Sequence, residues 1–410
     1  MSTTIANASP GPGLRQDAGV IGLVGLVHMI SHFNQLLLAP LFPWLKDAFQ
    51  ASYTELGFLM TLFFVVSCTV QAISGFLVDR YGPRPILFGG LALLATSAFG
   101  YSLSPGYWSM AFFSIVAGVG NGVFHPVNYT LLNRKVSAPR LGHAYSVHGI
   151  TGSLGWALAP AMLVPLAIAF SWRTALMGAG TLALAAMAAL WLNRDKLALP
   201  ASAPRHAAAA RAEGNFEFLR IPAVWMCFFF FFFYAVVLSV IQAFAPEAAR
   251  QLHGVPIALA AMCLTVYMVC SAGGMVLGGF LASDPARCER IVGIGFGLAA
   301  LVALVIGLGS VPALAVPALF GAMGFASGIA APSRDLLVKR STPDNATGRV
   351  YGIVYSGLDI GQAISPLIFG TLMDHQRYRG VWLGLVFMQA VLITSAFNVR
   401  RVRRTVLTAA

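Results

Sequence analysis

The chain has 410 residues, of which 58% are hydrophobic and only 10% are charged. A soluble surface cannot be covered by this small number of charged side chains. The composition therefore excludes a soluble globular protein and indicates a membrane protein. The net charge of +12 at pH 7 is typical of nucleic-acid binding or of a membrane protein with its basic residues on one side.

Apolar runs long enough to cross a bilayer as helices occur twelve times along the chain. The expected spans cover residues 19–43, 53–78, 84–104, 107–132, 142–168, 172–192, 222–246, 256–282, 290–310, 312–338, 346–372 and 380–399. Transmembrane β-strands would be shorter and would alternate in polarity, which these runs do not. The sequence therefore predicts an all-α membrane protein with twelve transmembrane helices, six in each half.

The segments between and around these runs divide the chain. We expect a disordered cytoplasmic tail at 1–18, a six-helix half at 19–193, a cytoplasmic linker at 194–220, a second six-helix half at 221–399 and a basic tail at 400–410. The five cysteines show no spacing typical of a disulfide or a metal site, so neither a metal nor a cofactor is expected.

The basic residues predict the orientation, because Lys and Arg in short loops stay on the cytoplasmic side. With both termini cytoplasmic, only Lys46, Arg173, Arg250, Arg377 and Arg379 fall on the outer side, and Arg334 alone falls inside a span. Topology thus accounts for the positive charge, and nucleic acid is not expected as a partner.

One stretch of the chain repeats at a constant offset of 206 residues, as 332 − 126 = 206 and 366 − 160 = 206 show. Gly118, Gly122, Pro126, Arg134, Gly142, Tyr145, Gly155 and Pro160 recur as Gly324, Gly328, Pro332, Arg340, Gly348, Tyr351, Gly361 and Pro366. An internal repeat of membrane spans is typical of secondary transporters, which bind their substrate between two related halves.

The loop after the second span carries Gly75, Asp79, Arg80, Gly82 and Arg84, a pattern that resembles the cytoplasmic signature of the major facilitator superfamily. Gly75 is expected to permit close helix packing, Asp79 to pair with basic residues, and the two arginines to hold the inner side. The alternative is an ordinary positive-inside hairpin with a tight turn at Gly82. The resemblance implies that spans 1, 4, 7 and 10 line the pathway and that the protein is a monomer.

A second resemblance covers about a third of the chain. The segments Gly118–Pro126 and His148–Gly155, with Ser31–Asn34, Pro40 and Pro43 in the first span, are similar to the fosmidomycin-resistance branch of drug exporters. The resemblance implies efflux by proton antiport. The chain departs from drug-proton antiporters at Ser114, where they usually keep an arginine.

Polar residues inside membrane spans are costly, so they should face a cavity or one another. They form three stripes with helical spacing: His28, His32 and Gln35; Asn121, His125 and Asn128; Tyr355, Asp359 and Gln362. We expect these stripes, together with Tyr129, to line one substrate cavity.

Asp359 is the first candidate for a proton carrier, because it lies near the middle of its span. The alternative is a carboxylate paired with Arg334 or hydrogen-bonded within the bundle. His32 and His125 are further candidates, because imidazole exchanges protons near neutral pH, and His28 and His148 are weaker ones. His125 could instead satisfy backbone groups freed by Pro126.

Arg334 has a fixed charge and forked donors that suit a carboxylate, phosphate or phosphonate, which favours an anionic substrate. Alternatively, Arg334 and Asp335 tie helix ends together as a gate.

The sequence as a whole predicts an inner-membrane, multi-pass secondary transporter that moves a small anionic or amphipathic organic solute by alternating access, with proton-coupled efflux favoured. An organic-anion:proton symporter is the alternative. A non-transporting receptor or an intramembrane enzyme is remote, because no output domain and no hydrolase or phosphate-loop motif occurs.

Overall fold

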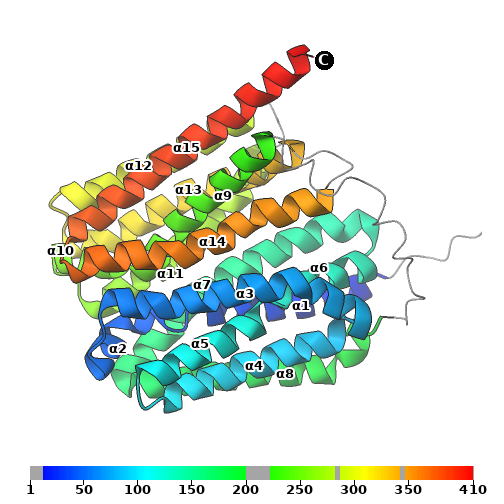
Figure 1. The fold of residues 1–410 in the computed structure, drawn as a ribbon, viewed down its shortest axis with the longest axis horizontal. Helices are drawn as coiled ribbons and strands as arrows, with labels where there is room; N and C mark the ends of the chain where they lie inside the picture. Colours follow the sequence, from blue (N-terminus) through cyan, green and yellow to red (C-terminus); the bar gives the residue numbers. More distant parts are fainter. Residues whose placement is uncertain (1–12, 200–221, 282–286, 342–346, 410) are drawn as a thin grey trace, which may run out of the picture.

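The computed structural model describes residues 13–199, 222–281, 287–341 and 347–409, and the regular elements of this part are all helices (Figure 1). The side chains of residues 334–355 and 396–409 fall outside the description. Three predicted site residues, Arg334, Asp335 and Tyr355, therefore have no described side-chain position.

The first half contains eight α-helices: α1 (Leu14–Gln35), α2 (Phe42–Phe49), α3 (Tyr53–Tyr81), α4 (Pro83–Leu103), α5 (Tyr107–Asn121), α6 (Phe124–Lys135), α7 (Leu141–Ala169) and α8 (Trp172–Leu192). The second half contains α9 (Pro222–Ala243), α10 (Ala245–His253), α11 (Ile257–Leu281), α12 (Cys288–Leu308), α13 (Val316–Ser341), α14 (Thr347–Asp374) and α15 (Tyr378–Ala409). Short 3-10 turns lie at Ala39–Leu41, Ala138–Arg140, Arg194–Leu197 and Ala313–Ala315.

Eleven segments of the described part are long and apolar enough to cross a membrane, and they coincide with eleven of the expected spans. The remaining expected span, 346–372, is occupied by α14. Of that helix, only the part from Ser356 to Asp374 has described side chains. The predicted all-α membrane fold is confirmed.

Two expected boundaries differ from the structure. The first helix begins at Leu14, so residues 14–18 are helical rather than part of a disordered tail. Asp17 explains the early start, because its buried carboxylate accepts hydrogen bonds from Ser137 Oγ and Arg140 Nε at 2.6 Å each and lies in the positively polarised first turn. At the other end, α15 continues to Ala409, where a tail was expected from residue 400.

Three expected spans are broken by prolines, which lack the backbone N–H that continues a helix. The first span ends at Gln35 and resumes as α2 after a turn that contains Pro40. The seventh span ends at Ala243, and Pro246 opens the short α10. The fourth span is divided into α5 and α6 just before Pro126.

The internal repeat is visible in the packing of the two halves. A Cβ added to Gly118 or Gly122 on α5 would strike the carbonyl oxygens of Phe63 and Ser67 on α3. At the repeated positions, a Cβ on Gly324 or Gly328 of α13 would strike the carbonyls of Tyr267 and Ser271 on α11. The repeat therefore preserves close helix contacts that only glycine permits.

The buried apolar side chains form one core that joins the halves and two that do not. The joint core includes Phe42 and Phe244, whose ring centroids are 6.0 Å apart across the halves. We call the end of the bundle that carries α2 and α10, opposite the C-terminus, the distal end (Figure 1). Separate cores lie around Val24 in the first half and Phe231 in the second.

Candidate functional site

Four histidines gather inside the first half, and we call them the histidine cluster. His28 and His32 come from α1, His125 from α6 and His148 from α7. The ring centroids of His28 and His148 are 3.5 Å apart and nearly parallel, and those of His28 and His32 are 4.1 Å apart. His125 is edge-on to His28 at 5.4 Å. Three rings are buried, whereas His125 is half-buried.

The cluster depends on close approach between α1 and α7. A Cβ on Gly152 would lie 2.7 Å from ring atoms of His28 and His32, and one on Gly155 would strike the carbonyl of Met29. The glycines of α7 therefore let its backbone lie directly against the α1 stripe.

The break between α5 and α6 leaves one backbone carbonyl without its helical donor. Pro126 cannot donate to the carbonyl four residues before it, which belongs to Gly122. That carbonyl accepts a hydrogen bond from Ser74 Oγ on α3 at 3.3 Å. The ring of His125 faces the other histidines and Tyr129.

A chain of hydrogen bonds connects the cluster with α3. The ring of His32 stacks on Trp156 at 4.3 Å, and Trp156 Nε1 donates to Gln35 Oε1 at 2.9 Å. Gln35 Nε2 lies 3.5 Å from Asn121 Oδ1, and Asn121 Nδ2 donates to Ser67 Oγ at 2.8 Å. The stripes of the first and fourth spans thus face one another.

Asn128 and Tyr129 border the cluster on the side away from the distal end. The Asn128 side-chain amide is buried and lies 3.3 Å from His148 Nε2. Tyr129 is 42% exposed and lies over His125 at 6.3 Å. At this border Tyr129 is thus the exposed residue and His125 the half-buried one.

Asp359 lies at the contact between the halves, on α14. Gln71 Nε2 of α3 donates to its Oδ2 at 3.4 Å, and the Cys68 thiol also hydrogen-bonds to its carboxyl group. Gln71 follows Ser67 by one helical turn, so α3 carries polar contacts from the cluster to Asp359. Gln362 is buried one turn further along α14.

Several polar contacts close the distal end between the halves. Asp374 at the end of α14 accepts hydrogen bonds from Tyr53 N at 2.6 Å, Thr54 N at 2.9 Å and Thr54 Oγ1 at 2.6 Å. Tyr53 Oη donates to Glu247 Oε1 at 3.3 Å. Glu247 accepts two hydrogen bonds from Arg250, which raise the pKa of that guanidinium above its ordinary value.

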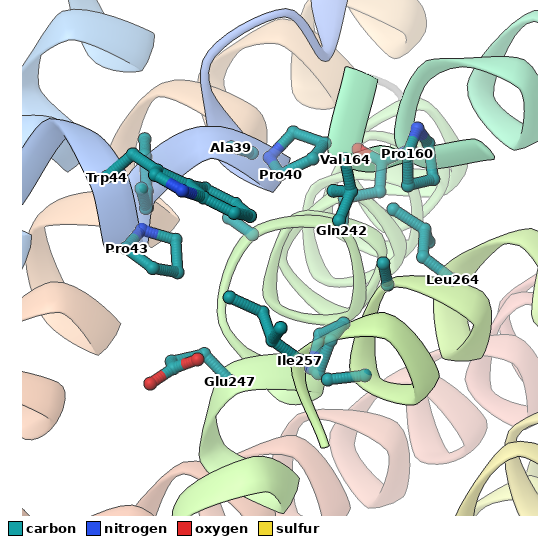
Figure 2. A pocket seen from close by; sticks show the side chains of 15 residues that line it. Ala39, Pro40, Pro43, Trp44, Pro160, Val164, Gln242, Glu247, Ile257 and Leu264 are labelled. Carbon is teal, nitrogen blue, oxygen red and sulfur yellow. The ribbon is translucent and has the colours of Figure 1, made fainter. Parts of the chain in front are cut away.

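A small pocket lies within this closure (Figure 2). Pro40 and Pro246, which are related by the repeat offset, both line it, together with Pro160 and Gln242. Both polar atoms of the Gln242 side chain are buried without a protein partner. The pocket is thus lined by both halves.

The predicted signature lies at the opposite end. Asp79 Oδ1 is 3.8 Å from Arg134 Nη2, and both side chains are exposed. Gly82 ends α3 with φ of +82°, a conformation that other residues rarely adopt. Arg80 lies over the Tyr81 ring, and Arg84 is exposed in the first turn of α4. The expected close packing at Gly75 is absent, because a Cβ there would meet nothing within 4 Å.

The sequence gives His28 and His148 less weight than His32 and His125, and it gives no sign of Ser67 or Gln71. His28 lies on the same stripe as His32. The positions of the other three depend on which helices pack together, which the period of a single helix does not encode.

Fold and site together define a pseudo-symmetric helical membrane bundle with a polar centre. The sequence profile of the Major Facilitator Superfamily matches residues 24–322 and 287–408. The chain belongs to this superfamily, whose members are membrane transporters rather than enzymes.

Curated relatives match parts of the chain. The fosmidomycin resistance protein of Escherichia coli is 27% identical over 154 residues, 36% of each chain. The membrane sensor protein UhpC of Escherichia coli is 27% identical over 253 residues, 57% of this chain and 55% of the sensor. The hexuronate transporter of Bacillus subtilis is 28% identical over 159 residues. The matches thus span between about a third and just over half of these relatives.

Solved structures match over nearly the whole length. A bacterial homologue of the human lysosomal transporter Spinster, inward-facing and occupied, has a TM-score of 0.77 at 14% identity, covering 95% of this chain and 98% of its own. The nucleoside transporter NupG has a TM-score of 0.75 at 12% identity. At these identities the likeness concerns the fold alone.

Proposed function

We propose that the protein is a secondary transporter that moves a small organic solute across the bacterial inner membrane by alternating access. The observation that carries this proposal is the asymmetry of the core. One apolar core joins the halves at the distal end, whereas each half keeps its own core elsewhere. With both termini cytoplasmic, as the basic residues favour, the distal end is external and the structure represents an inward-facing state.

In this proposal the substrate binds near the histidine cluster. His32, Gln35, Asn121, His125, Asn128 and Tyr129 contribute from the first half, and Arg334, Tyr355 and Gln362 from the second. The first group supplies neutral polar groups and an aromatic face, and Arg334 would supply a fixed positive charge. This combination favours an anionic or amphipathic solute. The gating alternative for Arg334 and Asp335 stays a prediction.

Asp359 is the proposed proton carrier. Its carboxyl group contacts Gln71 and Cys68 of the other half. Protonation changes the hydrogen bonds that this group makes across the interface, and the interface must rearrange when the transporter changes state. A proton and a substrate that favour different states would then be coupled. His32 and His125 remain sequence-based alternatives as carriers.

Proton-coupled efflux is the favoured direction, because the fosmidomycin resistance protein is among the relatives. Uptake by symport with an organic anion is the second candidate, favoured by the similarity to a hexuronate transporter. A sensor is the third, since a membrane sensor protein matches over more than half of this chain.

Proteoliposomes loaded with labelled candidate solutes separate these functions. Organic anions, phosphonates and cationic drugs would be tested, with external pH followed by a dye. External alkalinisation on adding a solute indicates proton symport, and acidification indicates antiport. Absence of both pH change and labelled-solute counterflow across the panel would favour the sensor.

Asp359→Asn tests the coupling. We expect proton-driven accumulation or expulsion to be lost while counterflow of labelled solute persists, because the amide keeps the shape but cannot exchange a proton. Asp47→Asn, at an exposed carboxylate of α2, is the matched control and should leave both activities unchanged. Gradient-driven transport that survives in Asp359→Asn would exclude Asp359 as the coupling residue.

A further inference from the structure

The histidine cluster also has the composition of a metal site. One ring nitrogen each from His28, His125 and His148 lies within 4.8 Å of the corresponding nitrogens of the other two. The three residues come from three different helices, α1, α6 and α7, and lie more than 20 positions apart in the sequence. For this reason the sequence shows no metal-ligand spacing.

The ring of His28 is oriented as metal-bound histidines usually are. Its Nδ1 lies 2.6 Å from the carbonyl oxygen of His148, which fixes Nδ1 as the protonated nitrogen. Its Nε2 then carries a free lone pair, and this atom is buried without a hydrogen-bond partner. A ring nitrogen that donates to a backbone carbonyl while the other is left for a ligand is the usual outer-shell arrangement.

A buried nitrogen without a partner is costly, so this orphaned atom is itself evidence for a missing ligand. The side-chain amide nitrogen of Asn128 lies 3.3 Å from His148 Nε2, and the Asn128 Oδ1 atom is buried without a partner. Turning this amide over brings Oδ1 to Nε2 as the acceptor of its proton, which leaves the lone pair of His148 Nδ1 for an ion. His125 is half-buried and provides the entry route past Tyr129.

We propose that His28, His125 and His148 bind a late first-row divalent transition-metal ion, such as Zn²⁺, within the first half. This site goes beyond the proposed transport of an organic solute. Neutral imidazoles suit Zn²⁺, Ni²⁺ and Cu²⁺, whereas Mg²⁺ and Ca²⁺ require oxygen ligands. The ligand set leaves a fourth position open. Because the three rings carry no negative charge, an anion such as hydroxide or chloride would occupy that position.

The rings must adjust slightly to bind the ion. Zn–N bonds of about 2.0–2.1 Å place the nitrogens of a tetrahedral site about 3.4 Å apart. The nitrogens now lie within 4.8 Å of one another, so the distances between them must shorten. Rotation of the imidazoles about their side-chain bonds can bring them closer. The near-parallel stack of His28 on His148 would open in the same movement.

The test is zinc titration of the full chain in lipid nanodiscs, purified with an affinity tag that contains no histidine. We expect one Zn²⁺ per chain and at least a tenfold loss of affinity in His28→Gln, His125→Gln and His148→Gln. The control variants His143→Gln and His375→Gln change exposed histidines outside the cluster and should bind as the unmodified chain does. Without zinc, each variant must unfold at the same temperature as the unmodified chain.

The proposal would be overturned if the unmodified chain showed no saturable zinc binding, or if a variant with all three substitutions bound zinc as tightly as the unmodified chain. Equal losses of affinity in the two control variants would overturn it as well. A measurement on the unmodified chain covers the case in which the variants do not fold. Co²⁺ in a site of three imidazoles and one further ligand should show the strong visible absorption of tetrahedral coordination. Only the weak absorption of hydrated Co²⁺ would count against the site.

Discussion

At Gly152, the backbone of α7 lies directly against two rings of the histidine cluster. A Cβ at this position would meet ring atoms of both His28 and His32. The absence of a side chain here is therefore a condition for the arrangement of these two imidazoles.

Gly152 gives a prediction at the residue scale. Gly152→Ala would place a methyl group against the rings of His28 and His32, 2.7 Å from their nearest atoms. Overpacking of this kind costs about 1–3 kcal/mol, so we expect a lower unfolding temperature in detergent and displacement of the two imidazoles. The unfolding temperature and the histidine NMR signals would measure the two effects.

Gly149→Ala is the matched control, one turn earlier on the same helix. A Cβ at Gly149 meets nothing within 4 Å, so this variant should unfold at the temperature of the unmodified chain or slightly above it. Equal behaviour of the two variants would show that close contact at Gly152 does not constrain the cluster.

Single side chains also show how far the sequence reaches. The period of a helix places His28, His32 and Gln35 on one stripe, because the cost of burying polar groups in a bilayer allows few other interpretations. The partners of that stripe could not be predicted in the same way. Trp156 and Ser67 become hydrogen-bond partners only through the packing of α7 and α3 around α1 and α5.

Among the helices, α3 makes the most informative contacts. Its first turn is held by Asp374 of the other half, its middle contacts Asn121 and Asp359, and Ser74 near its end satisfies the carbonyl freed by Pro126. The sequence predicted this helix and the signature after it. It overstated packing at Gly75, because the pattern within one helix does not say which neighbouring helix lies against it.

The amino terminus of α3 carries two caps, and they allow a matched experiment. Asp374→Ala removes three hydrogen bonds that cross between the halves. Ser52→Ala removes a cap inside one half, where Ser52 Oγ accepts from Glu55 N at 3.1 Å. Each change should destabilise the helix by about 0.5–2 kcal/mol.

Only Asp374→Ala should also open the distal end. Spin labels at Asp47 on α2 and Gln376 after α14 would report the distance between the halves. We expect a longer-distance population to grow in Asp374→Ala and to stay unchanged in Ser52→Ala. The same distances in both variants would mean that this cap does not hold the halves together.

For the whole molecule, the repeat was the most reliable sequence feature. Its glycines recur because the same close helix contacts are needed in each half: Gly118 and Gly122 face backbone carbonyls of α3, and Gly324 and Gly328 face those of α11. The polar residues of the candidate site do not recur: Asn128 aligns with Arg334, and Ser153 with Asp359. The two halves therefore share their architecture, whereas the histidine cluster belongs to one half and the carboxyl group at the interface to the other.

The repeat also predicts that two matched hydrogen bonds between the halves contribute similar free energies. Thr61 Oγ1 on α3 donates to the carbonyl of Ala363 at 2.6 Å, and Thr265 Oγ1 on α11 donates to that of Ala157 at 3.0 Å. The two alanines are repeat positions, and each bond crosses between the halves. Replacing each threonine by valine keeps the shape and removes only the hydroxyl.

We expect Thr61→Val and Thr265→Val each to favour opening of the distal end by about 0.6 kcal/mol, the typical value for a hydrogen bond between membrane helices. Because the sites are separate and share no partner, the double variant should show about the sum. The populations of the spin-label distances at Asp47 and Gln376 measure both. Thr69→Val is the control, since that hydroxyl bonds only to Val65 of its own helix. An effect of opposite sign in the two single variants would show that the halves are not held by equivalent contacts.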